Sequence, residues 1–392
     1  MRVAIWRSGL LAATLLLLSG CSTIGGWFSS DDDEDPRKPA ELQKITETVK
    51  VARLWSTGVG DGQGKGRYAL QPAISGDTLY AASADGELKA LNRQSGKRLW
   101  DRELDSGLSG GVGVYGNSLF LGGADGSVLR VSATDGELIW RVPVSSEVLA
   151  PPQSNGRVVV AQSYDGRLHG LDFETGRRLW THDSNMPALT IRGTSTPILR
   201  DNLVFAGFAS GRVLAFDIAT GAVQWEARVA IPQGRSEIER IVDVDGSMDL
   251  AGSELYAASY QGNLVAMEAS SGRKIWQQKV SSVSGVSTGF GNAYVADEDG
   301  TVYAWLRNGQ GLRWSQNALA WRGLGRPVPV SSYLAVPDFE GYVHLLSQVD
   351  GEFVGRLRVD RKGVRADMLS DGNTLYVYGN SGKLIAYEIR SR

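Results

Sequence analysis

A short pattern that returns eight times along the chain constrains its fold more than any other feature. Each unit contains an apolar run, a turn with Gly, an alternating run, a second turn with Gly and, in most units, a closing Trp. The glycines of the first turns are Gly86, Gly126, Gly166, Gly211, Gly262, Gly300, Gly341 and Gly382. They are separated by 40, 40, 45, 51, 38, 41 and 41 residues, and self-similarity at this period indicates a repeat architecture.

The runs within each unit have the periodicity of β-strands. Apolar and polar residues alternate with a period of two, as in residues 87–91 (Glu-Leu-Lys-Ala-Leu) and 212–216 (Arg-Val-Leu-Ala-Phe). Asp-Gly, Ser-Gly and Thr-Gly pairs between the runs supply hairpin turns, because Gly adopts the positive φ that these turns need. A four-stranded propeller blade takes about 40–50 residues. The sequence therefore predicts an all-β fold, an eight-bladed β-propeller of four-stranded antiparallel blades.

The two ends of the repeat region complement each other. Residues 51–55 (Val-Ala-Arg-Leu-Trp) match the end of a repeat without its beginning, and residues 373–387 form a repeat without its closing Trp. We therefore expect the N-terminal strand to pair with the C-terminal blade and to close the ring, which covers sheet edges that would otherwise be open. The predicted propeller spans residues 49–392.

The N-terminal residues have the features of an export signal. Arg2 and Arg7 precede the apolar residues 10–18, which are too few to span a bilayer, so residues 1–20 are predicted to be a signal peptide. Residues 18–21 (Leu-Ser-Gly-Cys) resemble the lipobox of bacterial lipoproteins, which implies cleavage before Cys21 and lipidation of that residue. An ordinary secretory signal is the alternative. Residues 21–48, which include an acidic run at 31–35, are predicted to be a flexible tether.

Composition and short motifs give little support for nucleic-acid binding or catalysis. The formal net charge is −2, so there is no basic surplus for nucleic acid, and the single cysteine excludes an intramolecular disulfide. Ser109 and Ser287 stand in Gly-x-Ser-x-Gly motifs, but both fall between repeats and not at a strand-to-helix turn. The three histidines, at 169, 182 and 344, lack the spacing of metal ligands.

A tryptophan pattern links the units to a known family. Ala-x-Asp/Asn-x-x-Ser/Thr-Gly-x-x-x-Trp occurs at residues 90–100 and 215–225 and, with Glu at the third position, at 266–276. This pattern resembles the tryptophan-docking repeat of quinoprotein-like eight-bladed propellers. A Trp at the end of each outer strand can pack between blades, so we interpret these residues as core. The seventh unit has Gly355 in place of Trp, which predicts a looser junction there.

The quinoprotein resemblance also offers an enzymatic alternative. It implies a dehydrogenase that uses pyrroloquinoline quinone and Ca²⁺, or a propeller that binds a small ligand. The chain has no spare cysteine for the disulfide that many such dehydrogenases carry. The longest step between repeats, 51 residues, exceeds the mean of about 42 by only about nine, which leaves no insertion for a cofactor chamber. We therefore predict no enzymatic activity, no cofactor and no metal site.

The repeat is interrupted in two consecutive connections, which are the candidate binding site. The first, residues 181–193, contains Leu189, Ile191 and Arg192, and the second, residues 232–246, contains Asp243 and Asp245. Consecutive connections lie on one face of a propeller. Apolar anchors beside an Arg and rimmed by acids suit a surface that binds a protein partner. The alternative is that Arg192 pairs with Asp243 or Asp245 and only fixes the two loops.

The lipobox, the acidic tether and the compact propeller together resemble the BamB family of outer-membrane assembly lipoproteins. The resemblance covers essentially the whole mature chain, and its local markers are residues 54–57, 189–193 and 240–245. It implies a periplasm-facing lipoprotein of the outer membrane that assists the folding and insertion of β-barrel proteins and has no enzymatic activity.

The same resemblance implies which partners and residues are involved. In that family the two connections contact the periplasmic POTRA domains of the barrel protein BamA, within the BAM complex. Carried over by position, the contact residues are Leu189, Ile191, Arg192, Asp243 and Asp245. Sheet edges offered to unfolded outer-membrane protein clients are a further implication. A lipoprotein with another envelope partner would have the same sequence features.

Overall fold

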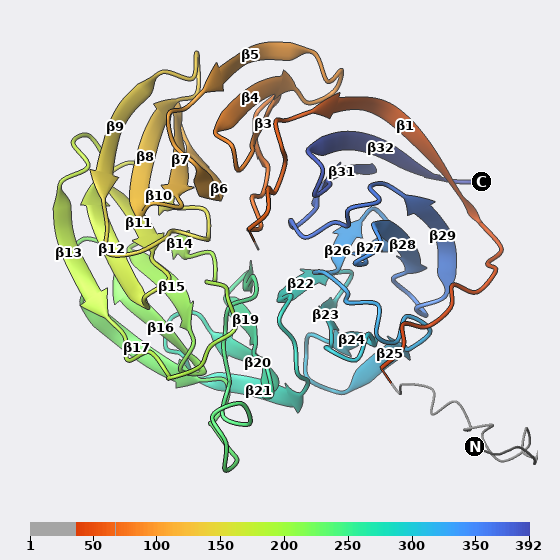
Figure 1. The fold of residues 1–392 in the computed structure, drawn as a ribbon. Helices are drawn as coiled ribbons and strands as arrows, with labels where there is room; N and C mark the ends of the chain where they lie inside the picture. Colours follow the sequence, from red (N-terminus) through yellow and green to blue (C-terminus); the bar gives the residue numbers. More distant parts are fainter. Residues whose placement is uncertain (1–36, 67) are drawn as a thin grey trace, which may run out of the picture. The chain divides into compact units, whose positions relative to one another are not determined.

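The computed structural model describes residues 37–66 and 68–392 of the chain, and every regular element among them is a β-strand. Contacts divide the chain into two units, residues 1–39 and 40–392, and all the strands of the described residues lie in the second. Its strands form eight four-stranded sheets set around a centre like the blades of a propeller (Figure 1). Within this described part there is no helix long and apolar enough to cross a membrane. The predicted eight-bladed propeller is confirmed.

Seven blades are continuous in sequence, and in each the strands follow one another from the centre outwards. The first three contain β2 (Ala73–Ser75), β3 (Thr78–Ala82), β4 (Glu87–Asn92) and β5 (Arg98–Glu103); β6 (Leu108–Tyr115), β7 (Ser118–Gly123), β8 (Ser127–Ser132) and β9 (Leu138–Pro143); and β10 (Gln153–Ser154), β11 (Val158–Gln162), β12 (Arg167–Asp172) and β13 (Arg178–Asp183). The next two contain β14 (Ile198–Arg200), β15 (Leu203–Phe208), β16 (Arg212–Asp217) and β17 (Val223–Arg228); and β18 (Asp249–Ala251), β19 (Glu254–Ala258), β20 (Asn263–Glu268) and β21 (Lys274–Lys279). The last two contain β22 (Val286–Gly289), β23 (Asn292–Ala296), β24 (Val302–Leu306) and β25 (Leu312–Gln316); and β26 (Val328–Val330), β27 (Tyr333–Pro337), β28 (Tyr342–Ser347) and β29 (Phe353–Arg358).

The eighth blade is assembled from both ends of the propeller, as predicted. It contains β30 (Leu369–Asp371), β31 (Thr374–Tyr378), β32 (Lys383–Ser391) and, outermost, β1 (Val49–Gly58). The register of β1 and β32 runs antiparallel from Val49 opposite Ser391 to Gly58 opposite Lys383. Figure 1 shows β1 along the outside of β32, where it closes the ring.

Burial follows from the packing of blades on one another. A middle strand has a neighbouring blade on each face, so both faces must be apolar, and all five residues of β11 (Val-Val-Val-Ala-Gln) are buried. An outer strand meets its neighbours with one face only. In β13, Trp180 is buried while Leu179 and Thr181 are exposed. Burial therefore alternates along β13 and not along β11.

The closing tryptophans join consecutive blades in a uniform way. The indole N–H of each donates to a backbone carbonyl of the next blade: Trp55 to Arg93 at 2.9 Å, Trp100 to Ala133 at 3.0 Å, Trp140 to Phe173 at 2.9 Å, Trp180 to Ile218 at 3.0 Å, Trp225 to Ala269 at 3.0 Å, Trp276 to Arg307 at 2.8 Å and Trp314 to Gln348 at 3.1 Å. The indole ring covers the second-turn Gly of that next blade. At Gly221, for example, a Cβ would lie 2.5 Å from the ring of Trp180. The repeated Gly is therefore required by the docked ring as well as by its positive φ of 72°.

The junction without a tryptophan is filled by the N-terminal strand. Val49, the first residue of β1, is 2% exposed and packs in one core cluster with Val354 and Leu375. A Cβ on Gly355 would lie 2.7 Å from Cγ2 of Val49. The expectation of a looser junction at Gly355 is therefore not met, because β1 supplies the apolar group that the repeat omits.

Residues 40–48, which we call the leading segment, contact the propeller before β1 begins. The N–H of Ala40 donates to the carbonyl of Ala320 at 2.8 Å, and Arg322 donates to the carbonyl of Ala40 at 3.0 Å. Arg356 donates to the carbonyl of Gln43 at 2.8 Å. The sequence predicts a flexible tether over residues 21–48, whereas the structure places residues 40–48 along the outside of β29 (Figure 1).

Candidate partner-binding site

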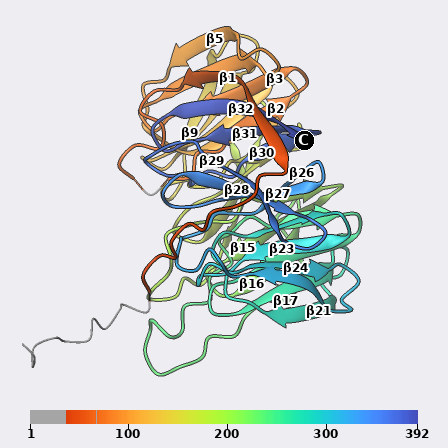
Figure 2. The same ribbon diagram turned by 90° about the vertical axis from the view of Figure 1, so that its right-hand side faces the viewer.

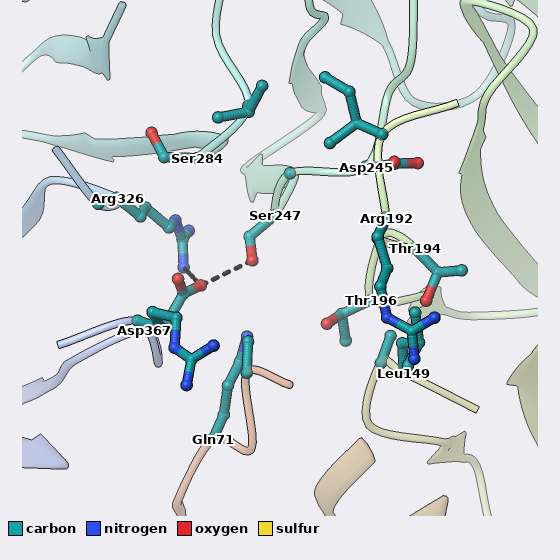
Figure 3. Close-up of a pocket in the computed structure, with 18 of the residues that line it drawn as sticks. Gln71, Leu149, Arg192, Thr194, Thr196, Asp245, Ser247, Ser284, Arg326 and Asp367 are labelled. Atoms are coloured by element: carbon teal, nitrogen blue, oxygen red, sulfur yellow. Dashed lines mark hydrogen bonds and ion pairs between the residues drawn. The ribbon is translucent and has the colours of Figure 1, made fainter. Parts of the chain in front are cut away.

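The connections that lead from the outer strand of one blade to the inner strand of the next meet near the centre of the ring. They enclose a cavity of about 250 Å³. Residues from the connections before β2, β10, β14, β18, β22, β26 and β30 line it, so segments far apart in the sequence share one site (Figure 3). The loops before β10, β14 and β18 contain Glu147, Arg192 and Asp243, respectively.

The structure brings the five predicted residues together. Ile191, Arg192, Asp243 and Asp245 line the cavity, and Leu189 lines a groove beside it. The N–H of Ile191 donates to Oδ2 of Asp243, which joins the loop before β14 to the loop before β18. The two interrupted connections therefore form one surface.

Arg192 has an internal partner, but not one of the two expected. Its guanidinium lies 2.6 Å from Oε2 of Glu147 and 5.2 Å from the ring centre of Tyr164. In Figure 3 the guanidinium points toward Leu149 and away from Asp245. The sequence does not indicate Glu147 as a partner, because it lies 45 residues before Arg192, in a loop without an interrupted repeat. Arg192 is thus held in place while its side chain remains about one-third exposed.

Among the described residues, neither of the two aspartates has a positive partner. Asp243 is 2% exposed, and Asp245 is partly exposed. Burial raises the pKa of Asp243 to about 6, against the opposing effect of the N–H of Ile191. Burial also raises the pKa of Asp245 well above its usual value, and the nearby charge of Asp243 raises it further. Both carboxyls therefore bind protons more tightly than in water.

On the opposite wall of the cavity, a positive and a negative side chain pair with each other. Arg326 lies 3.2 Å from Oδ2 of Asp367, and the hydroxyl of Ser247 donates to the same oxygen at 2.6 Å (Figure 3). Arg326 also donates to the carbonyl of Val286 at 2.8 Å. Arg326 and Asp367 therefore neutralise each other on this wall, in contrast to Asp243 and Asp245.

The groove beside the cavity is lined by exposed apolar side chains together with charged ones. It has a volume of about 670 Å³ and lies between the loop before β14 and the loop before β18. The apolar residues Leu189, Val223 and Ile231 of its lining are 45%, 45% and 56% exposed. The loop before β18 extends beyond the rest of the ring in Figures 1 and 2. Exposed apolar side chains on an extended loop are typical of a surface that another protein covers.

The motifs that imitate enzyme sites have structural roles. Ser109 is buried and donates to the carbonyl of Val148 at 2.9 Å, and Ser287 donates to the carbonyl of Pro327 at 2.6 Å. His344 is buried between Asp338, at 3.1 Å, and Arg356, at 3.0 Å. Among the described residues, no three His, Cys, Asp or Glu side chains are placed to share a metal ion.

Comparison with known proteins assigns the family. The family model described as outer membrane protein assembly factor BamB matches residues 43–108 and 84–316. A relative with that name from Pseudomonas aeruginosa is 46% identical over 385 residues, 98% of this chain and 99% of its own. This chain belongs to the BamB family. A BamB relative from Bordetella pertussis is 36% identical and covers 97% of this chain and 96% of its own length.

Solved structures agree with this assignment. The crystal structure of BamB from Moraxella catarrhalis matches with a TM-score of 0.80 at 28% identity, over 86% of this chain and all of that chain. A quinohemoprotein alcohol dehydrogenase from Comamonas testosteroni matches with a TM-score of 0.68 at 13% identity, over 86% of this chain and 76% of that chain. The second likeness shows only that the enzyme shares the propeller fold.

Proposed function

We propose that this chain is a non-enzymatic scaffold of the outer-membrane β-barrel assembly machinery. It binds the POTRA domains of BamA and assists the folding and insertion of outer-membrane proteins. The relatives that cover nearly the whole chain are named outer membrane protein assembly factors. The observation that carries the proposal is the groove with the exposed Leu189 and Ile231, which lies beside the cavity lined by Arg192, Asp243 and Asp245.

The physical properties of this surface favour protein binding. Covering Leu189, Val223 and Ile231 removes apolar surface from water, at about 25 cal/mol for each Å². Arg192 is already oriented by Glu147 and Tyr164, so little side-chain entropy is lost when a partner contacts it. Rigid polar anchors beside exposed apolar groups are the usual composition of an interface hot spot.

The proposal includes the membrane attachment. Residues 1–20 are proposed to be removed as a signal peptide, and Cys21 to carry the lipid that holds the chain at the periplasmic side of the outer membrane. Both segments lie outside the described residues. We further propose that the outer strands offer edges to unfolded clients, as extended peptides commonly add to exposed sheet edges.

A pull-down in mild detergent tests the partner assignment. The tagged full chain should retain BamA, and both Leu189→Arg and Arg192→Glu should reduce the retained amount at least ten-fold with a nearly unchanged Tm. Leu99→Arg is the matched control, because Leu99 is 54% exposed on β5, away from the groove. If the groove variants still retain BamA, the binding site lies elsewhere on the chain. If the wild type captures a different envelope protein and not BamA, that protein is the partner.

The quinone-dependent dehydrogenase has less support. It would need a Ca²⁺ site built from several carboxylates, and the described residues offer no cluster of three acidic or other metal-binding side chains. Absorbance and calcium content after incubation with pyrroloquinoline quinone test this alternative directly. Stoichiometric uptake of both would contradict the scaffold proposal.

A further inference from the structure

The end of β29 and the connection that follows it carry a local excess of positive charge. Residues 356–365 contain five Arg or Lys and one Asp, in a chain whose formal net charge is −2. Two of the five donate to backbone carbonyls, and the other three are exposed: Arg358, Arg361 and Lys362. The partner-binding surface described above uses none of these three.

The fold turns the acid of this stretch inwards and leaves the bases outside. Asp360 is 4% exposed, and its carboxylate accepts from two backbone N–H groups, at 2.7 and 3.0 Å. Within the described part of the chain, neither Arg361 nor Lys362 has a carboxylate within ion-pair distance. Arg358 lies 5.0 Å from the ring centre of Tyr342 and is in the same range also without an ion pair. Three positive side chains therefore face solvent without compensation.

An exposed aromatic side chain borders these bases. Phe339 is 49% exposed in the turn between β27 and β28. Its carbonyl oxygen lies against the loop that carries Lys362, because a Cβ on Gly363 would come within 2.7 Å of that oxygen. This close approach and a φ of 91° both require Gly at position 363. We call Phe339, Arg358, Arg361 and Lys362 the basic patch.

The leading segment begins beside the basic patch. The guanidinium of Arg322 lies 5.7 Å from the ring centre of Phe339 and donates to the carbonyl of Ala40 at 3.0 Å. The N–H of Phe339 in turn donates to the carbonyl of Arg322 at 3.1 Å. From Cys21 to residue 39 the chain has 39 − 21 + 1 = 19 residues, which span at most about 65 Å. A lipid on Cys21 would therefore hold the basic patch within reach of the membrane surface.

We propose that the basic patch binds the membrane surface, with its three positive side chains at anionic lipid headgroups and Phe339 at the boundary to the acyl chains. This inference rests on the membrane attachment in the proposed function and adds the surface with which the propeller contacts the bilayer. Anionic lipids attract Lys and Arg, and an exposed aromatic ring gains by leaving water. Because the lipid already holds the chain at the membrane, even a weak contact is populated. The basic patch thus determines which edge of the propeller faces the bilayer.

Fluorescence quenching in vesicles tests this contact. Cys21 is the single cysteine of the chain and is proposed to be lipidated, so an added cysteine supplies the free thiol for a dye. The lipidated full chain carries the dye on Lys362→Cys or, as the control position, on Lys97→Cys. Lys97 is exposed in the turn between β4 and β5, at the opposite end of the strands from the connection after β29.

The vesicles contain phosphatidylethanolamine, the anionic phosphatidylglycerol and a lipid with a quencher in its headgroup. We expect quenching at position 362 to be at least about three-fold stronger than at position 97. Salt at about 0.5 M should reduce it to the value at position 97, because it screens exposed charges. Vesicles of neutral phosphatidylcholine should give the same low value.

Two variants of the Lys362→Cys chain separate the charge from the aromatic ring. Arg361→Glu and Phe339→Ser should each lower the quenching to the value at position 97, with a nearly unchanged Tm. Arg177→Glu is the matched control, because Arg177 is exposed in the turn between β12 and β13, away from the basic patch. It should leave the quenching unchanged.

Four outcomes would overturn the proposal, and each has its own signature. If the chain floats with the vesicles but both dye positions are quenched equally, the propeller has no preferred edge. If Arg361→Glu or neutral vesicles leave the quenching unchanged, the positive charge does not hold the contact. If strong quenching appears only after residues 31–35 are replaced by Ser, that acidic run occupies the basic patch. If Arg361→Glu instead loses BamA in the pull-down, the patch binds the protein partner.

Failure of the proposed membrane attachment is recognised separately. In that case the wild-type chain does not float with the vesicles at all, whatever their lipid composition. The wild-type pull-down of BamA tests the partner assignment without vesicles, so its result does not depend on the basic patch.

Discussion

The backbone N–H of Ile191 and the carboxylate of Asp243 form a hydrogen bond between residues 52 positions apart. Ile191 belongs to the loop before β14, and Asp243 belongs to the loop before β18. The bond therefore fixes one interrupted connection against the next, and through them it shapes one wall of the cavity.

Loss of this bond should loosen the loop before β14. Asp243→Ala removes the acceptor, and a lost buried hydrogen bond costs about 1–3 kcal/mol. We expect amide hydrogen exchange at Ile191 to become about ten-fold faster or more. Asp243→Asn keeps an oxygen acceptor at the same position and is the control. Equal exchange rates in the wild type and in Asp243→Ala would mean that the loop is held by other contacts.

The burial of Asp243 predicts a pH-dependent stability with a defined sign. Below pH 4 the carboxyl is protonated in the folded and in the unfolded chain, so it adds no pH dependence. Between pH 4 and the folded pKa of about 6 the unfolded chain loses its proton first, so stability is lost as the pH rises. Asp243→Asn does not titrate and keeps the acceptor for Ile191.

Relative to the wild type, Asp243→Asn should therefore gain up to about 3 kcal/mol at pH 7, since two pKa units correspond to about that energy, and almost nothing at pH 4. Thermal unfolding of both proteins across this range measures the difference. A constant offset at all pH values would show that Asp243 does not titrate in the folded protein.

The junction at Gly355 should not accept a side chain. Gly355→Ala places a methyl group 2.7 Å from Cγ2 of Val49, and overpacking of a core costs about 1–3 kcal/mol. Val49→Ala removes the clash, so the double variant should lose less stability than the sum of the two single variants. Gly58→Ala is the control, because a Cβ on Gly58 would have no heavy atom within 4 Å. Additive losses would indicate that Val49 and Gly355 do not share this space.

Arg322 should anchor the leading segment. Its side chain is 4% exposed, lies 2.8 Å from Oδ2 of the fully buried Asp338 and donates to the carbonyl of Ala40. Arg322→Met leaves a buried carboxylate without its main partner, which costs about 3–5 kcal/mol. Limited proteolysis should then cleave within residues 40–48 before the propeller is digested.

The matched control for Arg322 is Arg98→Met. Arg98 pairs with Asp101 at the surface, where the side chains are 63% and 40% exposed, and such pairs contribute at most about 1 kcal/mol. If Arg98→Met and Arg322→Met gave the same proteolysis pattern, the leading segment would not depend on the buried network.

The sequence was sufficient to predict the architecture, because the strands of a blade follow one another along the chain. The position of Trp55, without a preceding repeat, identified the closing strand, and the interrupted connections placed Leu189 and Asp243 on one face. Contacts between distant loops could not be predicted in this way. Glu147 lies in an ordinary connection, so nothing in its surroundings indicates a partnership with Arg192. Likewise, the role of Val49 depends on three-dimensional closure and not on its own repeat.

The leading segment has a mechanical consequence for the closed ring. Val49 pairs with Ser391 at the terminal end of β32, so a pull applied directly at Val49 would break the bonds between β1 and β32 one after another, as a zipper opens. The chain instead passes first through the contacts of Ala40 and Gln43 with Arg322 and Arg356. Tension that arrives from the N-terminal side therefore acts first on a different blade. The leading segment thus protects the pairing between β1 and β32, which closes the propeller, from that tension.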